Sequence, residues 1–217
     1  MSLPIRLGLF YSALFIGSGV SSPYMPVWFA HHGLNGAQIG LILSLPMLGR
    51  AFTAPLMAVW ADSFRLRRTA LMVMALIVSV AYGLMALPLG LAGWMVVWFA
   101  ASSAFSTIAP LTDVIVLKRA RTDGFNYGWP RGIGSAAFIV GNVVMGAVLT
   151  RGSPELVLVW ITAAVALTAL GARFLLPPDP VHEAGHVPQA SDRWAGIGEL
   201  LRDPAFMTAA ISCGLIQ

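Results

Sequence analysis

Long apolar stretches recur along nearly the whole chain, and each is long enough to cross the roughly 30 Å hydrocarbon layer of a membrane as a helix. The chain has 58% hydrophobic residues, seven tryptophans and a mean hydropathy of +0.79, far from the balance of a soluble globular domain. The expected spans are Leu7–Phe29, Ala37–Ala61, Ala70–Leu87, Trp94–Leu117, Pro130–Thr150 and Leu156–Leu176. We therefore predict an all-α, polytopic membrane bundle of six transmembrane helices.

The same pattern divides the chain into three parts. We expect residues 1–176 to form the six-helix bundle, residues 177–203 a linker, and residues 204–217 the start of a seventh helix. The linker contains Trp194, Ile197, Leu200 and Leu201 at the spacing of a short surface helix, whereas the prolines and glycines around His182 and His186 favour a solvated loop over a metal site. The seventh apolar stretch is too short to span a membrane, so we expect either a gene boundary there or a longer protein.

Basic residues predict the orientation, because short loops rich in Lys and Arg stay on the cytoplasmic side. They gather in the second, fourth and sixth connections and near the amino terminus, with Arg151 as the exception. Both termini are thus expected on the cytoplasmic side of the membrane. We expect that membrane to be a bacterial inner membrane. The pI near 9.8 arises from these loops, so no nucleic-acid partner is expected. The lone Cys213 excludes an intrachain disulfide and a multi-cysteine metal site.

Three charged residues fall within the predicted spans. Asp113 lies near the end of the fourth span, Arg131 just inside the fifth and Arg50 near the middle of the second. Because ionisable groups in lipid are costly, they usually face a bundle interior and mark the path of a solute, ion or proton. We expect Asp113 and Arg131 to meet in the cytoplasmic third of the bundle, between adjacent antiparallel helices.

Two interpretations of this pair stay open at this stage. In the first interpretation, the two residues form an interhelical ion pair that only joins two helices, or Arg131 by itself extends toward the membrane surface. Alternatively, Asp113 binds a proton or a solute hydroxyl, while Arg131 or Arg50 holds a carboxylate in bidentate fashion. Further candidates for hydrogen bonds to the solute are Tyr24, Asn142 and Tyr11.

Small residues are concentrated in two of the spans. The first contains Gly17, Ser18, Gly19, Ser21 and Ser22, and the fifth contains Gly132, Gly134, Ala137 and Gly141. Such faces let helices approach closely, so a packing role is favoured over direct contact with a ligand. Prolines late in the first and fourth spans suggest two three-helix units in opposite orientation, a 3+3 inverted repeat that recurs among transporters.

The connection after the second span resembles the loop signature of the major facilitator superfamily, in which an aspartate precedes a run of basic residues. Asp62 and Arg67-Arg68 keep the charges of that signature, whereas Ala58, Ser63 and Arg65 replace its first glycine, its arginine and its second glycine. The resemblance implies that Asp62, Arg67 and Arg68 form a gating loop at the cytoplasmic face.

Longer strings resemble the branch of this superfamily that contains phenylpropionic acid transporters and, more distantly, the lactose permease. They are Gly19-Val20-Ser21-Ser22-Pro23-Tyr24-Met25-Pro26, Gly33-Leu34, Pro110-Leu111-Thr112-Asp113, Asp123-Gly124 and Tyr127-Gly128-Trp129-Pro130-Arg131-Gly132-Ile133-Gly134-Ser135. The resemblance covers only the first half of a twelve-helix transporter. Relatives of the lactose permease bind solute through an acidic residue and an arginine at the places of Asp113 and Arg131, while Trp129 replaces a further arginine.

The resemblance implies proton-driven symport of a small organic solute, for which an aromatic carboxylate is our hypothesis, by alternating access against a carboxy-terminal half absent from this chain. No cofactor is expected beyond the proton gradient. The competing class is a membrane protein that does not transport, either truncated or acting as a six-helix association module. A membrane enzyme ranks third, because the sequence offers no paired nucleophile and base and no metal cluster.

Overall fold

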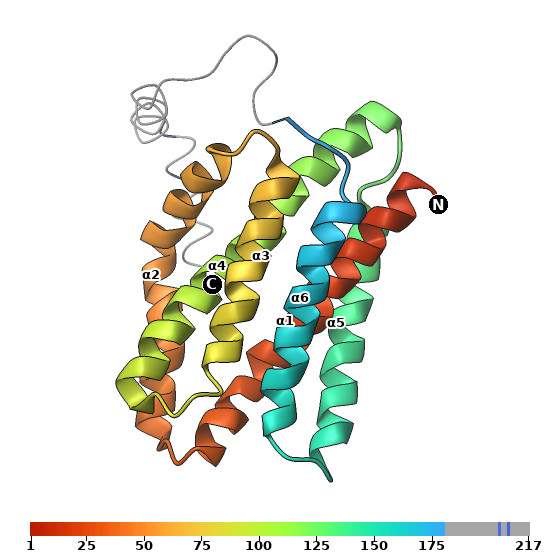
Figure 1. Ribbon diagram of the computed structural model, residues 1–217. Coiled ribbons are helices and arrows are strands. Elements are labelled where there is room, and N and C mark those ends of the chain that lie inside the picture. Colours follow the sequence, from red (N-terminus) through yellow and green to blue (C-terminus); the bar gives the residue numbers. More distant parts are fainter. Residues whose placement is uncertain (181–203, 205–207, 209–217) are drawn as a thin grey trace. The chain divides into compact units, whose positions relative to one another are not determined.

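The computed structural model describes residues 1–180 and, beyond them, Pro204 and Thr208 (Figure 1). The surface helix and the seventh helix expected from the sequence lie almost entirely outside the described residues. The helices in the described part are α1 (Leu3–His31), α2 (Gly36–Asp62), α3 (Arg67–Leu84), α4 (Gly90–Asp123), α5 (Gly128–Leu149) and α6 (Glu155–Phe174). The prediction of an all-helical membrane bundle is confirmed.

Helix bounds differ most from the sequence expectation at α4, which begins four residues before Trp94 and ends six residues after Leu117. Hydropathy marks only the part of a helix that lies in lipid, whereas the backbone hydrogen bonds continue into the polar residues that follow. Gly124, with φ of 70°, ends the helix in the left-handed conformation that glycine adopts readily. At α2, the helix start is closed by a capping box between Asn35 and Gln38.

In the described part of the chain, five helices are each long and apolar enough to cross a membrane, and α2 makes a sixth if its two bent parts count as one span. The two parts of α2, Gly36–Arg50 and Phe52–Asp62, meet at an angle of 57°. Pro55 explains the bend, because a proline has no N–H for the carbonyl four residues earlier, that of Ala51, and its ring collides with that carbonyl. Arg50 is therefore the last residue before the bend.

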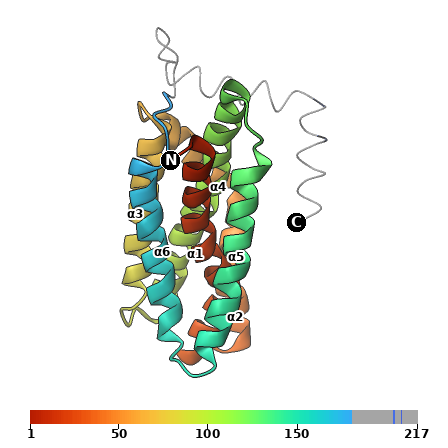
Figure 2. The ribbon, with the colours of Figure 1, turned by 90° about the vertical axis from the view of Figure 1, so that its right-hand side faces the viewer.

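The helices pack in a pattern that confirms the inverted repeat. The main contacts join α1 to α5 and α6, α3 to α4 and α6, and α2 to α4. If α1 is exchanged with α4, α2 with α5 and α3 with α6, the same pairs of contacting helices result. Two three-helix units of opposite orientation require this symmetry. Figures 1 and 2 show the consequence: α1 lies along both α5 and α6. The expectation that the fourth and fifth helices pack as neighbours is wrong, because α1 is the helix packed against α5.

Glycines allow α1 and α5 to approach at backbone distance. A Cβ placed on Gly141 would lie 2.7 Å from the Ile16 carbonyl oxygen, and one on Gly19 would collide with the Phe138 carbonyl oxygen. Gly134 likewise faces the Tyr11 and Phe15 side chains. Gly132, however, has no atom near that position, so the small-residue face predicted for this helix begins two residues later than expected, at Gly134.

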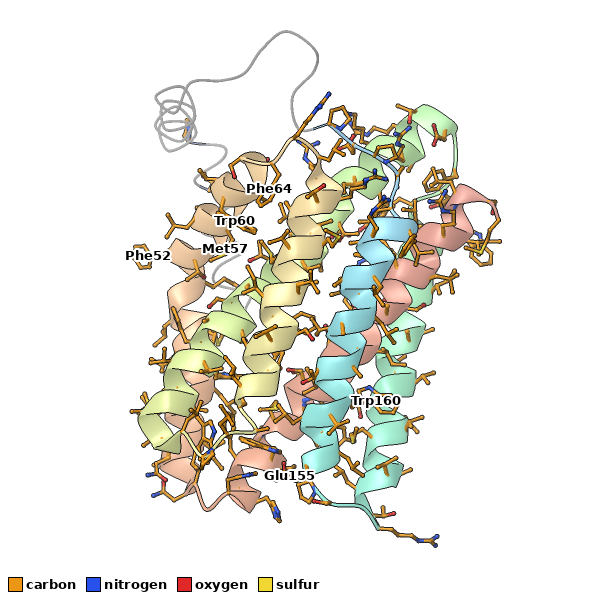
Figure 3. The ribbon with its side chains drawn as sticks, viewed as in Figure 1. Phe52, Met57, Trp60, Phe64, Glu155 and Trp160 are labelled. Carbon is orange, nitrogen blue, oxygen red and sulfur yellow. The ribbon has the colours of Figure 1, made fainter. Side chains whose placement is uncertain are left out.

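Polar contacts close each end of the bundle. At the end opposite the basic connections, Glu155, labelled in Figure 3, accepts a hydrogen bond of 3.0 Å from Trp28 Nε1, and its carboxylate lies 3.2 Å from His32 Nε2. At the other end, Asp179 is buried against the ends of α3 and α4, where its carboxylate lies 2.7 Å from Arg67 and 3.1 Å from Lys118. The first residues of the predicted linker are thus part of the bundle surface.

The outer faces of the helices are apolar and exposed. Phe52 is 76% exposed and projects away from α2 in Figure 3. Leu48 on the same helix and Val96 on α4 are also exposed. Soluble proteins rarely expose so many large apolar side chains, whereas a lipid environment covers them at little cost.

Candidate functional site

Asp113 is held by the hydroxyl groups of two tyrosines. Tyr11 on α1 and Tyr127, the residue before α5, both donate to its Oδ1 atom, the latter over 2.9 Å. Burial raises the pKa of Tyr127, and the hydrogen bond to Asp113 raises it further. The Tyr127 phenol therefore keeps its proton and acts as a donor at neutral pH. Two donated hydrogen bonds stabilise the ionised form of a carboxylate even when no arginine bonds to it.

Arg131 lies beside this carboxylate but mainly contacts an aromatic ring. Its Nε atom is 3.9 Å from Asp113 Oδ1, which is an ion-pair separation and too long for a hydrogen bond. The centre of its guanidinium is 4.2 Å from the centroid of the Phe15 ring and 5.7 Å from that of Tyr11. The sequence-predicted pair does meet, and α1 supplies the aromatic surface between the two helices. The arginine is thus positioned by a cation–π contact rather than by direct bonding to Asp113.

Tyr24 and Asn142 are not part of this cluster. The Tyr24 hydroxyl donates to the Asn142 backbone oxygen over 2.9 Å and lies 3.4 Å from its side-chain oxygen. Asn142 follows Arg131 by eleven residues, which is roughly 16 Å along a helix. The two residues therefore join α1 to α5 toward the opposite end of the bundle.

A cavity of about 410 Å³ lies between α1, α2, α3 and α4, and Arg50 lines it. Its polar wall contains five serines: Ser18, Ser21, Ser22, Ser102 and Ser106. Its aromatic wall consists of Tyr82, Trp98 and Phe105. Ala109 also lines the cavity and precedes Asp113 by one helical turn, so the cavity approaches the Asp113 cluster along α4. Such a cavity has room for a small organic molecule.

The predicted gating residues lie at the basic end. Asp62 is the last residue of α2, and Arg67 and Arg68 begin α3. Arg67 pairs with Asp179, and its backbone N–H donates to the Asp179 carbonyl oxygen over 3.0 Å. Arg67 is therefore bound by an ion pair and a backbone hydrogen bond to the segment that follows α6.

Several residues of the site were not predicted from the sequence. Tyr127 precedes Arg131 by four residues, a spacing that places two side chains on one helix face, and it begins one of the strings that carry the family resemblance; these two signals pointed to it. Phe15, Tyr82 and Trp98 are apolar or aromatic residues in apolar helices, where nothing in the sequence distinguishes a cavity wall from a lipid-facing surface.

Comparison with known proteins agrees with this architecture. Residues 4–217 match the MFS_1 like family. Over 199 residues the chain is 29% identical to the probable 3-phenylpropionic acid transporter of Escherichia coli, covering 90% of this chain and 51% of the relative. It is 31% identical over 182 residues to the maltose permease of Geobacillus stearothermophilus, covering 82% of this chain and 45% of the relative. The chain thus spans about half the length of these relatives. It belongs to the MFS_1 like family of major facilitator superfamily transporters.

Proposed function

We propose that the chain forms the amino-terminal half of a proton-driven symporter for a small organic acid, with an aromatic carboxylate as the solute. The observation that carries this proposal is the position of Arg131, which rests on the Phe15 ring beside a carboxylate already bonded to two hydroxyls. A guanidinium has five N–H donors in a planar fork that fits a carboxylate. The names of the relatives support an organic solute, and one of these names contains an aromatic acid, 3-phenylpropionic acid.

The same cluster supports the proposal of proton coupling. When Asp113 is ionised, it attracts Arg131 and repels a second carboxylate. When Asp113 takes up a proton, both effects vanish, and Arg131 can hold the solute anion. A solute and a proton would therefore be bound together, which is the condition for symport. Arg50 supplies a second cation, in the adjoining cavity.

Alternating access would require rocking of this six-helix bundle against a carboxy-terminal half, with Asp62, Arg67 and Arg68 acting at the cytoplasmic face. Tyr24 and Asn142 would affect this motion through the contact between α1 and α5 rather than through the solute. Transport, rather than catalysis, is the activity we propose, in keeping with the relatives.

The proposal is tested by expressing the open reading frame that contains these residues in a host unable to take up 3-phenylpropionate. We expect uptake of the labelled acid, its loss when a protonophore collapses the proton gradient, and its abolition by Arg131→Ala with membrane insertion intact.

Arg151→Ala is the matched control, because this exposed arginine lies in the connection between α5 and α6 and should not affect uptake. Uptake that is unchanged by Arg131→Ala would contradict the role of the cluster. Uptake that persists without a proton gradient would contradict symport, and uptake of maltose in place of the acid would contradict the proposed solute class.

A further inference from the structure

His32, the residue that follows α1, has an acceptor at each of its two ring nitrogens. Its Nδ1 atom lies 3.0 Å from the Trp28 carbonyl oxygen, and its Nε2 atom lies 3.2 Å from Glu155 Oε1. A backbone carbonyl can only accept a hydrogen bond, and so can an ionised carboxylate. A neutral imidazole has a single N–H and satisfies only one of these two contacts, whereas the protonated ring donates to both.

The position of Glu155 favours its ionised form. It is the first residue of α6, where the helix dipole stabilises an anion, and its side chain is 46% exposed (Figure 3). Its Oε2 atom accepts the hydrogen bond from Trp28 Nε1. The second carboxylate oxygen is therefore left as an acceptor for the N–H of His32.

The ring of Trp28 adds a third contact to His32. The centroids of the two rings are 3.9 Å apart, and the ring planes are inclined by 32°. The face of an indole ring attracts a cation, so this stacking also favours the protonated imidazole. A carbonyl, a carboxylate and an aromatic face thus all select the same charge state of His32.

The other groups around His32 do not compete with Glu155. His31 on α1 meets the His32 ring edge-on at 5.6 Å, is exposed, and forms no ion pair in the described part of the chain. From α4, the uncharged ring of Trp94 lies 5.3 Å away. Arg151, in the connection before α6, forms no ion pair with Glu155 in the structure of residues 1–180. Among the described residues, Glu155 is therefore the charged partner of His32.

This contact lies at the end of a helix segment that two prolines weaken. Pro23 and Pro26 precede His32 by nine and six residues, and each lacks the N–H that would bond to the preceding turn of α1. Ser22, immediately before Pro23, lines the cavity between α1, α2, α3 and α4. The charge of His32 therefore affects how firmly α1 is held to α6 near one end of that cavity.

We propose that His32 and Glu155 form a proton-binding site at the end of the bundle opposite the basic connections, which holds the end of α1 against α6 when His32 is protonated. The inference stands apart from the proposed function, because it involves neither the Asp113 cluster nor a solute. Histidine is the side chain that ordinarily changes its charge between about pH 5 and 8. The stabilisation by this contact is present at the acid end of that range and is lost as the pH rises and His32 releases its proton.

The experiment is thermal unfolding of the purified full chain in detergent, at about pH 5.5 and about pH 8.5, on the two sides of the histidine range. Wild type is compared with His32→Gln, whose amide can donate a hydrogen bond but cannot take up a proton. At the lower pH, His32→Gln should reduce the Tm by about 2–4 °C, as the loss of one charged contact does in a chain of this size. At the higher pH this difference should largely disappear.

His31→Gln is the matched control, because it removes a neighbouring exposed histidine that has no carboxylate partner in the described part of the chain. Its effect on the Tm should be the same at both pH values. In a Glu155→Gln background, His32→Gln should lose its pH-dependent effect, since the partner no longer carries a charge.

Two outcomes of these measurements would overturn the proposal. An effect of His32→Gln that is equal at both pH values would show that the residue only packs against its neighbours. A pH-dependent effect that persists undiminished in Glu155→Gln would show that the proton is not held by this pair.

A spectroscopic readout keeps the proposal testable even if a variant unfolds too easily for the thermal comparison. In the full chain labelled with ¹⁵N-histidine, the ring signals that disappear in His32→Gln should show a proton on both nitrogens at pH 7. Glu155→Gln should convert these signals to those of a neutral ring. A neutral His32 ring at pH 7 in the wild type would contradict the proposed site.

Discussion

The individual residues around Asp113 show how a charge is accommodated in an apolar bundle. Desolvation of a carboxylate is offset by two tyrosine hydroxyls from different helices, and the arginine is placed on an aromatic ring at ion-pair distance. Each donor to Asp113 weakens its attraction for Arg131, because a carboxylate oxygen that already accepts two hydrogen bonds offers less charge to a third partner. The tyrosines thus control how strongly Arg131 is held.

Tyr127→Phe should therefore weaken solute binding without removing it. With one hydroxyl gone, Asp113 draws Arg131 closer, and the half-saturation concentration for the organic acid should rise by about tenfold, the equivalent of one hydrogen bond. The measurement is uptake kinetics in Tyr127→Phe and, separately, in an Asp113→Asn background. In that background the tyrosine substitution should have little further effect, since its partner is no longer charged; equal effects in both backgrounds would contradict the coupling.

At the scale of elements, the contact between α1 and α5 depends on glycines that only the structure distinguishes. Gly141 and Gly134 face atoms of α1 at distances that no Cβ tolerates, whereas Gly132 on the same helix faces open space. A side chain at the first two positions would force the helices apart, and the cluster around Asp113, which spans α1, α4 and the start of α5, would open with them.

Gly141→Ala should accordingly destabilise the bundle by about 1–3 kcal/mol, the usual cost of overpacking a tight contact. Gly132→Ala is the matched control: alanine favours the helix by up to about 1 kcal/mol and meets no neighbour. Thermal unfolding of the two purified variants in detergent, followed by circular dichroism, measures the difference. A lower Tm for Gly132→Ala than for Gly141→Ala would contradict the packing argument.

For the whole molecule, the inverted repeat places the connections that are rich in Lys and Arg at one end, whereas the opposite end carries Glu155 and, as an exception, Arg151. The connections between α2 and α3 and between α4 and α5 lie at the same end as the amino terminus. By the preference of basic loops for the cytoplasmic side, that end should face the cytoplasm.

Cysteine labelling tests this orientation in intact cells. In a Cys213→Ser background, His31→Cys at the end of α1 should react with a membrane-impermeant thiol reagent, whereas Thr122→Cys near the end of α4 should react only after the cells are permeabilised. Both positions are exposed, so accessibility of the side chain itself does not differ. The reverse labelling pattern would place the basic end outside.

The sequence by itself determined the number of helices, their approximate bounds, the alternation of basic and uncharged connections, and the meeting of Asp113 with Arg131. Each of these depends on properties that are local along the chain: apolar length, the cost of a charge in lipid, and the position of Lys and Arg. Even the expected repeat of three helices was visible in the spacing of prolines, and the packing of the helices confirms it.

Only the tertiary structure decided which side chains share an environment. A membrane helix is apolar on its lipid-facing and its buried sides alike, so hydropathy does not reveal which face turns inward. For that reason the sequence did not predict that α1 separates α4 from α5, that Tyr127 joins Tyr11 on Asp113, or that Arg131 rests on Phe15. Nor did it distinguish Trp94, whose indole N–H donates to Met85, from Trp98 one turn away, whose indole N–H has no acceptor among the described residues, because the acceptor of a side-chain donor lies on another part of the chain.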